Sequence, residues 1–128
     1  MKKILIVEDD VSYLKLLNDQ LTRNGYEIIQ AKNGKEGLEI AKRTQPDLII
    51  LDIKMPVMDG IAMLDEYRKD VYGRSANVIF LTNLDPDDKI LQSVLKDLPK
   101  YYFIKSDIQL SELLEKIKNI LFPEKKSE

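Results

Sequence analysis

The sequence alternates between short, continuous apolar runs and longer stretches in which apolar residues recur every three or four positions. A continuous apolar run is typical of a β-strand that is covered on both faces, as in a parallel sheet. The five runs lie at 3–7, 26–31, 47–53, 77–82 and 101–105. Because a helical pattern follows each run, this order predicts an α/β fold with a doubly wound, five-stranded parallel sheet and five helices.

Capping residues mark the expected beginnings of several helices. Asn33 and Ser106 each have a Glu or Gln three positions on, which is the spacing of a capping box. Asp85 stands directly before a proline, an arrangement that favours an N-cap followed by the first helical position. The apolar stripe of the third helix is expected to run on to Val71.

Composition excludes several classes of function. The 128 residues suit one domain, and the chain contains no histidine and no cysteine. Catalytic triads that need these residues, zinc sites built from them and disulfides are therefore excluded. The net charge of −2 gives no basic excess for binding nucleic acid, and no apolar run approaches the roughly 18 residues of a membrane span.

Polar residues collect where the predicted strands end. They are Glu8, Asp9 and Asp10 after the first strand, Asp52 in the third, Thr82 in the fourth and Lys105 in the fifth. Ligands of doubly wound sheets bind beyond the carboxyl ends of the strands. Taken singly, each residue has an ordinary explanation as a helix cap, a turn residue or a solvated lysine. Their joint placement predicts one acidic crevice with a single ammonium group.

The charges in such a crevice need a partner. Two carboxylates 4 Å apart repel each other by roughly 4 kcal/mol at an effective dielectric constant of about 20. Since Lys105 offsets only one acid, either a carboxyl group stays protonated or a cation binds, and oxygen ligands alone suit Mg²⁺. An aspartate beside a metal, an ammonium and a hydroxyl can attack a phosphoryl group and form an aspartyl-phosphate. Asp52, Asp9 or Asp10, Lys105 and Thr82 are the corresponding groups.

Four motifs together resemble the receiver domain of two-component response regulators. They are ILIVEDD, PDLIILDIKMPVMDG, VIFLTN and YYFIKSD, and they occur in this order from Lys3 to about Phe122. The resemblance implies a flavodoxin-like fold with strand order 2-1-3-4-5, formed by residues 1–122, with 123–128 as a flexible tail. It implies a cytoplasmic phosphoacceptor that is not an enzyme, apart from its own phosphorylation and slow autodephosphorylation.

The resemblance also implies partners and a role for each site residue. Asp52 would accept a phosphoryl group from a sensor histidine kinase or a histidine phosphotransfer protein. Mg²⁺ would be held by Asp10 and Asp52 directly, by Asp9 through water and by the main-chain carbonyl of Lys54. Thr82 and Lys105 would contact the phosphoryl group, and Tyr102 would turn inward as Thr82 moves. The face of helix four, strand five and helix five would then bind a downstream effector, or an output domain outside this sequence.

Two residues near the crevice deserve separate expectations. The family usually has a proline after the lysine, joined by a cis bond, whereas this chain has Ser106. A cis bond before a non-proline residue costs about 3–4 kcal/mol, so we expect a trans bond and a serine hydroxyl that caps the last helix. Lys54, two residues after Asp52, is expected to modulate access of the hydrolytic water.

Two other functions are alternatives to that of a phosphoacceptor. An interaction module with a receiver fold but no phosphorylation would be indifferent to Mg²⁺, and the complete set of acid, threonine and lysine argues against it. A flavodoxin-like binder of nucleotide or flavin is disfavoured, because no glycine-rich phosphate loop follows the first strand.

Overall fold

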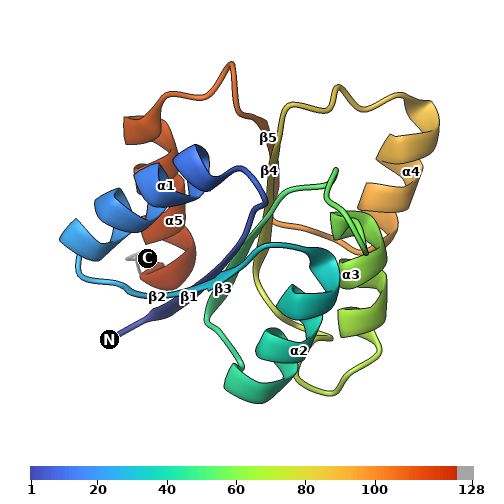
Figure 1. Cartoon of the computed structure of the whole chain (residues 1–128), viewed down its shortest axis with the longest axis horizontal. Helices are drawn as coiled ribbons and strands as arrows, with labels where there is room; N and C mark the ends of the chain where they lie inside the picture. The colour runs from blue at the N-terminus through green and yellow to red at the C-terminus, as the bar shows by residue number, and fades with distance from the viewer. Residues whose placement is uncertain (124–128) are drawn as a thin grey trace, which may run out of the picture.

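The computed structural model describes residues 1–123 and contains one parallel sheet with strand order β2-β1-β3-β4-β5 (Figure 1). The strands are β1 (Lys3–Val7), β2 (Glu27–Ala31), β3 (Leu48–Leu51), β4 (Val78–Thr82) and β5 (Tyr101–Ile104). The helices are α1 (Val11–Arg23), α2 (Gly34–Thr44), α3 (Gly60–Arg68), α4 (Asp88–Lys96) and α5 (Leu110–Leu121). The predicted fold class and strand order are confirmed.

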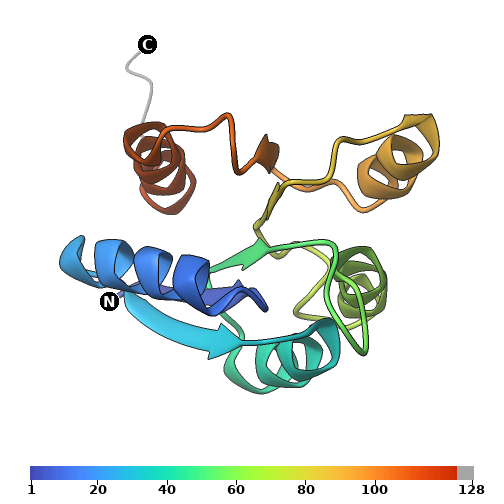
Figure 2. The same cartoon turned by 45° about the horizontal axis from the view of Figure 1, so that its top comes forward.

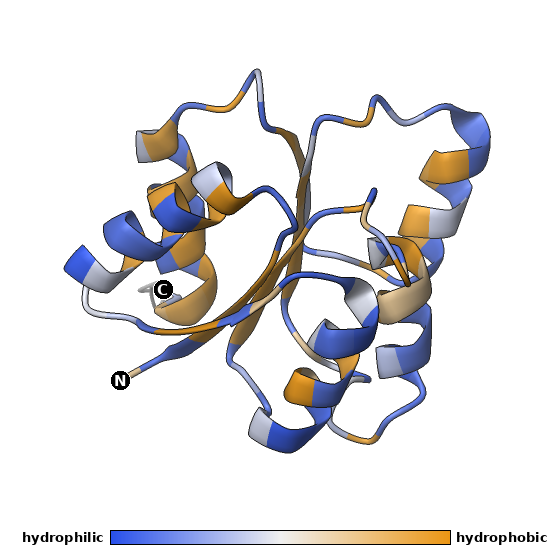
Figure 3. Ribbon diagram, viewed as in Figure 1, coloured by the Kyte–Doolittle hydropathy of each residue, from blue (hydrophilic) through white to orange (hydrophobic). Residues whose placement is uncertain are grey.

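Helices cover both faces of the sheet. Figures 1 and 2 show α1 and α5 on one side and α2, α3 and α4 on the other. Successive side chains of a strand point to opposite faces, so each strand contributes side chains to both hydrophobic cores, one on each face of the sheet. Ile4 and Ile6 pack with α1 and α5, whereas Leu5 and Val7 pack with α2 and α3. The central strands β1, β3 and β4 are accordingly almost wholly apolar, whereas the edge strand β2 carries the exposed Glu27 and Gln30. Figure 3 shows polar residues on the outer faces of the helices.

Of the three predicted helix caps, one is confirmed and two are wrong. Asn33 does cap α2, with its side chain accepting from the Glu36 amide at 2.9 Å. Helix α4 is capped by Asp87 and not by Asp85, because Asp87 is the residue whose side chain reaches the third amide of the helix. Helix α5 begins at Leu110 without a side-chain cap, so the predicted cap at Ser106 is wrong.

The end of α3 also differs from the expectation, whereas the expected C-terminal tail is not tested. Helix α3 ends at Arg68, and Val71 lies in the turn beyond it with 65% of its surface exposed. The expected tail at 123–128 falls, apart from Pro123, outside the described residues. Within residues 1–123 no helix is long and apolar enough to cross a membrane.

Gly60 brings the start of α3 against the end of β3. A Cβ atom at this position would lie 2.0 Å from the Asp52 carbonyl oxygen, which no side chain tolerates. The Gly60 amide donates to the carbonyl of Ile53 at 2.9 Å, and Asp59 caps the helix through the Ala62 amide. The glycine therefore closes the loop after β3 tightly around Asp52.

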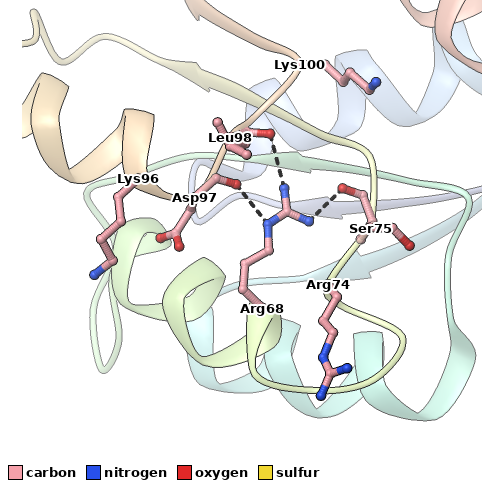
Figure 4. Close-up of a pocket in the computed structure, with 8 residues that line it drawn as sticks. Arg68, Arg74, Ser75, Lys96, Asp97, Leu98 and Lys100 are labelled. Atoms are coloured by element: carbon pink, nitrogen blue, oxygen red, sulfur yellow. Dashed lines mark hydrogen bonds between the residues drawn. The ribbon is translucent and has the colours of Figure 1, made fainter.

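Arg68 joins α3 to the loops that flank α4. Its guanidinium donates to the carbonyls of Gly73, Ala76, Asp97 and Leu98 at 2.7 to 3.3 Å. Figure 4 shows this group in the middle of a pocket between α3 and the loops that flank α4, with the Asp97 and Leu98 carbonyls turned toward it. One side chain thus ties the end of α4 to the loop between α3 and β4.

Asp97, at the end of α4, is a buried acid with an incomplete set of hydrogen bonds. Asp97 is 8% exposed, and its Oδ2 has no hydrogen-bond partner among the described residues. Burial and the neighbouring carboxylate of Asp65 together raise the pKa of Asp97 to about 6, against the attraction of Lys96 and Arg68. The folded protein therefore binds a proton at Asp97 more tightly than the unfolded chain does.

We predict that Asp97→Asn stabilises the protein at pH 7. Because the folded-state pKa is raised, the free energy of unfolding of the wild type falls as the pH rises from about 4 to about 6, and it stays lower above this window. The variant should lose this fall and be more stable at pH 7 by about 1–3 kcal/mol, the cost of an unsatisfied buried polar group. Urea unfolding of both proteins across this pH range measures the difference in the free energy of unfolding. The exposed Asp19→Asn is the control, and an unchanged slope in Asp97→Asn would contradict the prediction.

Candidate functional site

A crevice of about 400 Å³ opens at the carboxyl ends of the strands. Its lining includes Glu8, Asp9, Asp10, Asp52, Lys54, Thr82 and Lys105. The ends of β1, β3, β4 and β5 therefore deliver their polar residues to one place, as the sequence predicts. Figure 1 shows the loops after these strands leaving the same edge of the sheet.

Asp52 follows β3 directly and is only 8% exposed. Its Oδ1 accepts from the Ile53 amide at 2.7 Å, and its Oδ2 accepts from the Lys105 ammonium at 2.9 Å. The Asp52 amide donates to the carbonyl of Val7 at 3.0 Å, which continues the pairing of β3 with β1. The carboxylate is thus held at the floor of the crevice by the sheet itself.

Three carboxylates meet in the crevice, those of Glu8, Asp9 and Asp52. Each offers an oxygen atom, and these atoms lie within 4.8 Å of one another. Burial, with a smaller contribution from the nearby charge of Asp52, raises the pKa of Glu8 to about 7, although Lys105 and the Asp10 amide oppose this rise. The cluster therefore carries more negative charge than its single lysine neutralises, and it favours a proton or a cation.

Asp10 does not belong to this cluster. It is the N-cap of α1, and its Oδ1 accepts from the amides of Ser12 and Tyr13 at 3.0 and 3.2 Å. The structure therefore does not bring Asp10, the expected direct metal ligand, into the cluster, and it places Glu8 beside Asp52. An aspartate immediately before the stripe that starts at Val11 is the usual sign of an N-cap, so this signal was present in the sequence.

Lys105 links three strands at the centre of the site. Its ammonium bonds Glu8 and Asp52 and lies 4.6 Å from the centre of the Tyr13 ring. Burial alone would lower the pKa of this lysine, but the hydrogen bonds to the two carboxylates outweigh burial and raise it. The ammonium is therefore charged and directed at Asp52.

Thr82 and Tyr102 contact the same residue of the loop after β4. Thr82 is 2% exposed, and its hydroxyl oxygen accepts from the Leu84 amide at 3.3 Å. The Tyr102 hydroxyl donates to the Leu84 carbonyl at 2.5 Å, and its ring packs at an angle on Phe80, 6.0 Å away. Tyr102 is thus half-buried beside the loop after β4.

The two remaining residues of interest lie at the rim. Lys54 lines the crevice with an exposed side chain. The Lys105–Ser106 bond is trans, as expected, since residues 1–123 contain no cis peptide bond. The Ser106 amide donates to the side-chain oxygen of Asn83 at 3.1 Å, a contact that no sequence pattern predicts.

The donor set fits Mg²⁺. This ion prefers oxygen ligands and binds through one or two carboxylates while it keeps several waters. Glu8, Asp9 and Asp52 supply such oxygens at the mouth and floor of an open crevice. The raised pKa of Glu8 is the electrostatic sign that positive charge would be favoured here.

Comparison with known proteins gives one consistent family. The profile of the response regulator receiver domain matches residues 4–118. The sporulation initiation phosphotransferase F of Bacillus subtilis is 35% identical over 120 residues, which cover 94% of each chain. The alkaline phosphatase synthesis transcriptional regulatory protein PhoP of the same organism is 40% identical over 91 residues, 70% of this chain but 37% of PhoP.

Solved structures of receiver domains have the same fold as this chain. The receiver domain of a sensor histidine kinase from Pseudomonas aeruginosa, with a magnesium ion in its active-site cleft, superimposes with a TM-score of 0.83 at 25% identity, covering 94% of this chain and 97% of that one. The fold, the crevice and these relatives lead to one conclusion: the chain belongs to the receiver domains of response regulators, and its role is that of a phosphoacceptor in two-component signalling.

Proposed function

We propose that Asp52 is the phosphoacceptor of this receiver domain. The observation that carries the proposal is the setting of its carboxylate, which lies at the floor of the crevice against the Lys105 ammonium, with Glu8 and Asp9 alongside. A carboxylate oxygen of Asp52 attacks phosphorus, the bond from phosphorus to the donor breaks, and an acyl phosphate remains. The donor is a phosphohistidine of a sensor histidine kinase or of a histidine phosphotransfer protein, and a cytoplasmic location is part of the proposal.

Mg²⁺ would be held by Glu8, Asp9 and Asp52, together with the main-chain carbonyl of Lys54. When bound, the ion supplies positive charge against the phosphoryl oxygens. Lys105 contributes a second cation, and it is already fixed by its bonds to Glu8 and Asp52. Asp10 has a separate task, because it caps α1.

The reaction is confined to the chain's own carboxylate. Water slowly hydrolyses the acyl phosphate, which releases inorganic phosphate and restores the Asp52 carboxylate. The domain therefore turns over no separate substrate. A new dianion at Asp52 attracts the Thr82 hydroxyl, which is joined through Leu84 to Tyr102. The altered face of α4, β5 and α5 then binds a downstream effector or an output domain. Such couplings are typically about 1–3 kcal/mol.

We predict that acetyl phosphate labels the protein only when Mg²⁺ is present, and that Asp52→Asn takes no label, because an amide is not a nucleophile here. Incorporation of radioactive phosphate measures this. Asp85→Asn is the matched control, since Asp85 lines the same crevice and is exposed. Label that persists in Asp52→Asn would show that another residue is the acceptor.

The metal ligands give a second prediction. Asp9→Asn should raise the Mg²⁺ concentration for half-maximal labelling by about tenfold or more, as loss of a ligating charge does. Asp10→Asn should leave this concentration unchanged, because asparagine caps helices as well as aspartate does. Titration of the labelling rate with MgCl₂ compares the two variants. An equal shift in both would put Asp10 back among the ligands.

Lys54 gives a third prediction, on the lifetime of the phosphoryl group. If its ammonium shields the crevice from water, Lys54→Ala should speed autodephosphorylation about two- to tenfold, a change of about 0.4–1.4 kcal/mol in the barrier. Decay of the label after removal of acetyl phosphate measures the rate, with the exposed Lys42→Ala as control. An unchanged decay rate would remove Lys54 from the mechanism.

A further inference from the structure

Two loops diverge from the edge of the sheet beside the crevice. The β4–α4 loop, residues 83–87, follows Thr82, and the β5–α5 loop, residues 105–109, begins with Lys105. Figure 1 shows them leaving neighbouring strands and running to opposite sides of the molecule. What holds them together at their origin therefore affects both Thr82 and Lys105.

Pairing of the two strands continues into these loops by one side chain. The last bond between main-chain groups runs from the Lys105 amide to the Thr82 carbonyl, at 2.8 Å. The next amide, that of Ser106, donates to the side-chain oxygen of Asn83 at 3.1 Å. The asparagine side chain thus takes the place of a further strand carbonyl at the point where the loops part.

The same loop conformation also sets the Thr82 hydroxyl. The Leu84 amide donates to Thr82 Oγ1 at 3.3 Å and so occupies a lone pair of that oxygen. A hydroxyl has one hydrogen to donate besides its acceptor sites, and here that hydrogen remains available for an anion in the crevice. Asn83 lies between these two contacts, because it is the residue that joins Thr82 to Leu84.

We propose that Asn83 is a positioning residue for phosphoryl transfer. By accepting the Ser106 amide it holds the β4–α4 loop in the arrangement in which Leu84 orients the Thr82 hydroxyl as a donor toward Asp52. The inference rests on the proposed function of Asp52, and it adds a contact between the two loops to the groups that touch the phosphoryl group. Asn83 itself acts through Thr82.

The test uses both ends of the bond in the full chain. Asn83→Ala removes the acceptor, and Ser106→Pro removes the donor, because proline has no amide hydrogen. Ser106→Ala is the matched control, since it removes the hydroxyl and keeps the amide. The rate constant for labelling by acetyl phosphate at saturating Mg²⁺ is measured for each variant and for the double variant Asn83→Ala/Ser106→Pro.

We expect Asn83→Ala and Ser106→Pro each to lower this rate constant by about three- to tenfold, as the loss of one net hydrogen bond does. The double variant should be no slower than either single one, and Ser106→Ala should match the wild type. The Mg²⁺ concentration for half-maximal labelling should not move. Wild-type labelling by Asn83→Ala, equal loss in Ser106→Ala and Ser106→Pro, or multiplying losses in the double variant would each overturn the proposal.

Amide hydrogen exchange separates this inference from the function on which it rests. In the unphosphorylated protein, Asn83→Ala should speed exchange at Ser106 and also at Leu84, whose amide the loop conformation holds on Thr82. Unchanged exchange at Leu84 would show that Asn83 does not hold the loop. A wild-type protein that takes no label would instead overturn the proposed function, while the Leu84 amide would still decide whether Asn83 orders the loop.

Discussion

The Lys105 ammonium, shared between the carboxylates of Glu8 and Asp52, is the contact on which the site depends. Its three members come from the ends of β5, β1 and β3, so it fixes the separation of strands that are not all neighbours. One cation among three acids leaves a deficit of positive charge, and burial together with the charge of Asp52 raises the pKa of Glu8. A divalent ion would satisfy it, and a phosphoryl group could then approach an otherwise repellent cluster.

The residues around this cluster of charges are closely packed and held by main-chain contacts. Asp52 and Thr82 are almost fully buried, and the Asp52 amide is bound to β1 while Gly60 packs against its carbonyl. A small displacement of any of these groups would change distances at which unit charges interact strongly. By contrast, the groups proposed to respond to the charge, Thr82 and Tyr102, both contact Leu84, which lies in the loop beyond the end of β4.

The sequence predicts the fold and the meeting of the strand ends well, because both follow from patterns that repeat along the chain. Apolar runs covered on two faces leave few alternatives, and parallel strands bring their carboxyl ends to one edge. The finer assignments fail where one residue type serves two purposes. Asp10 is the cap of α1, Asp87 and not Asp85 caps α4, and Ser106 contacts Asn83 through its amide and does not cap α5.

The way α4 is held suits an element that moves at low cost. Only Val94 of this helix is buried, whereas α5 buries Leu113, Ile117 and Leu121. Its far end is secured by Arg68 through bonds to main-chain carbonyls, next to an acid whose burial is unfavourable at neutral pH. Burying one aliphatic side chain contributes about 1.5–3 kcal/mol, which is close to the free energy that a typical coupling between two sites supplies. In the proposed switch, a charge at Asp52 would shift α4 without unfolding the sheet, and the exposed Leu91 and Leu95 belong to the face that would meet a partner.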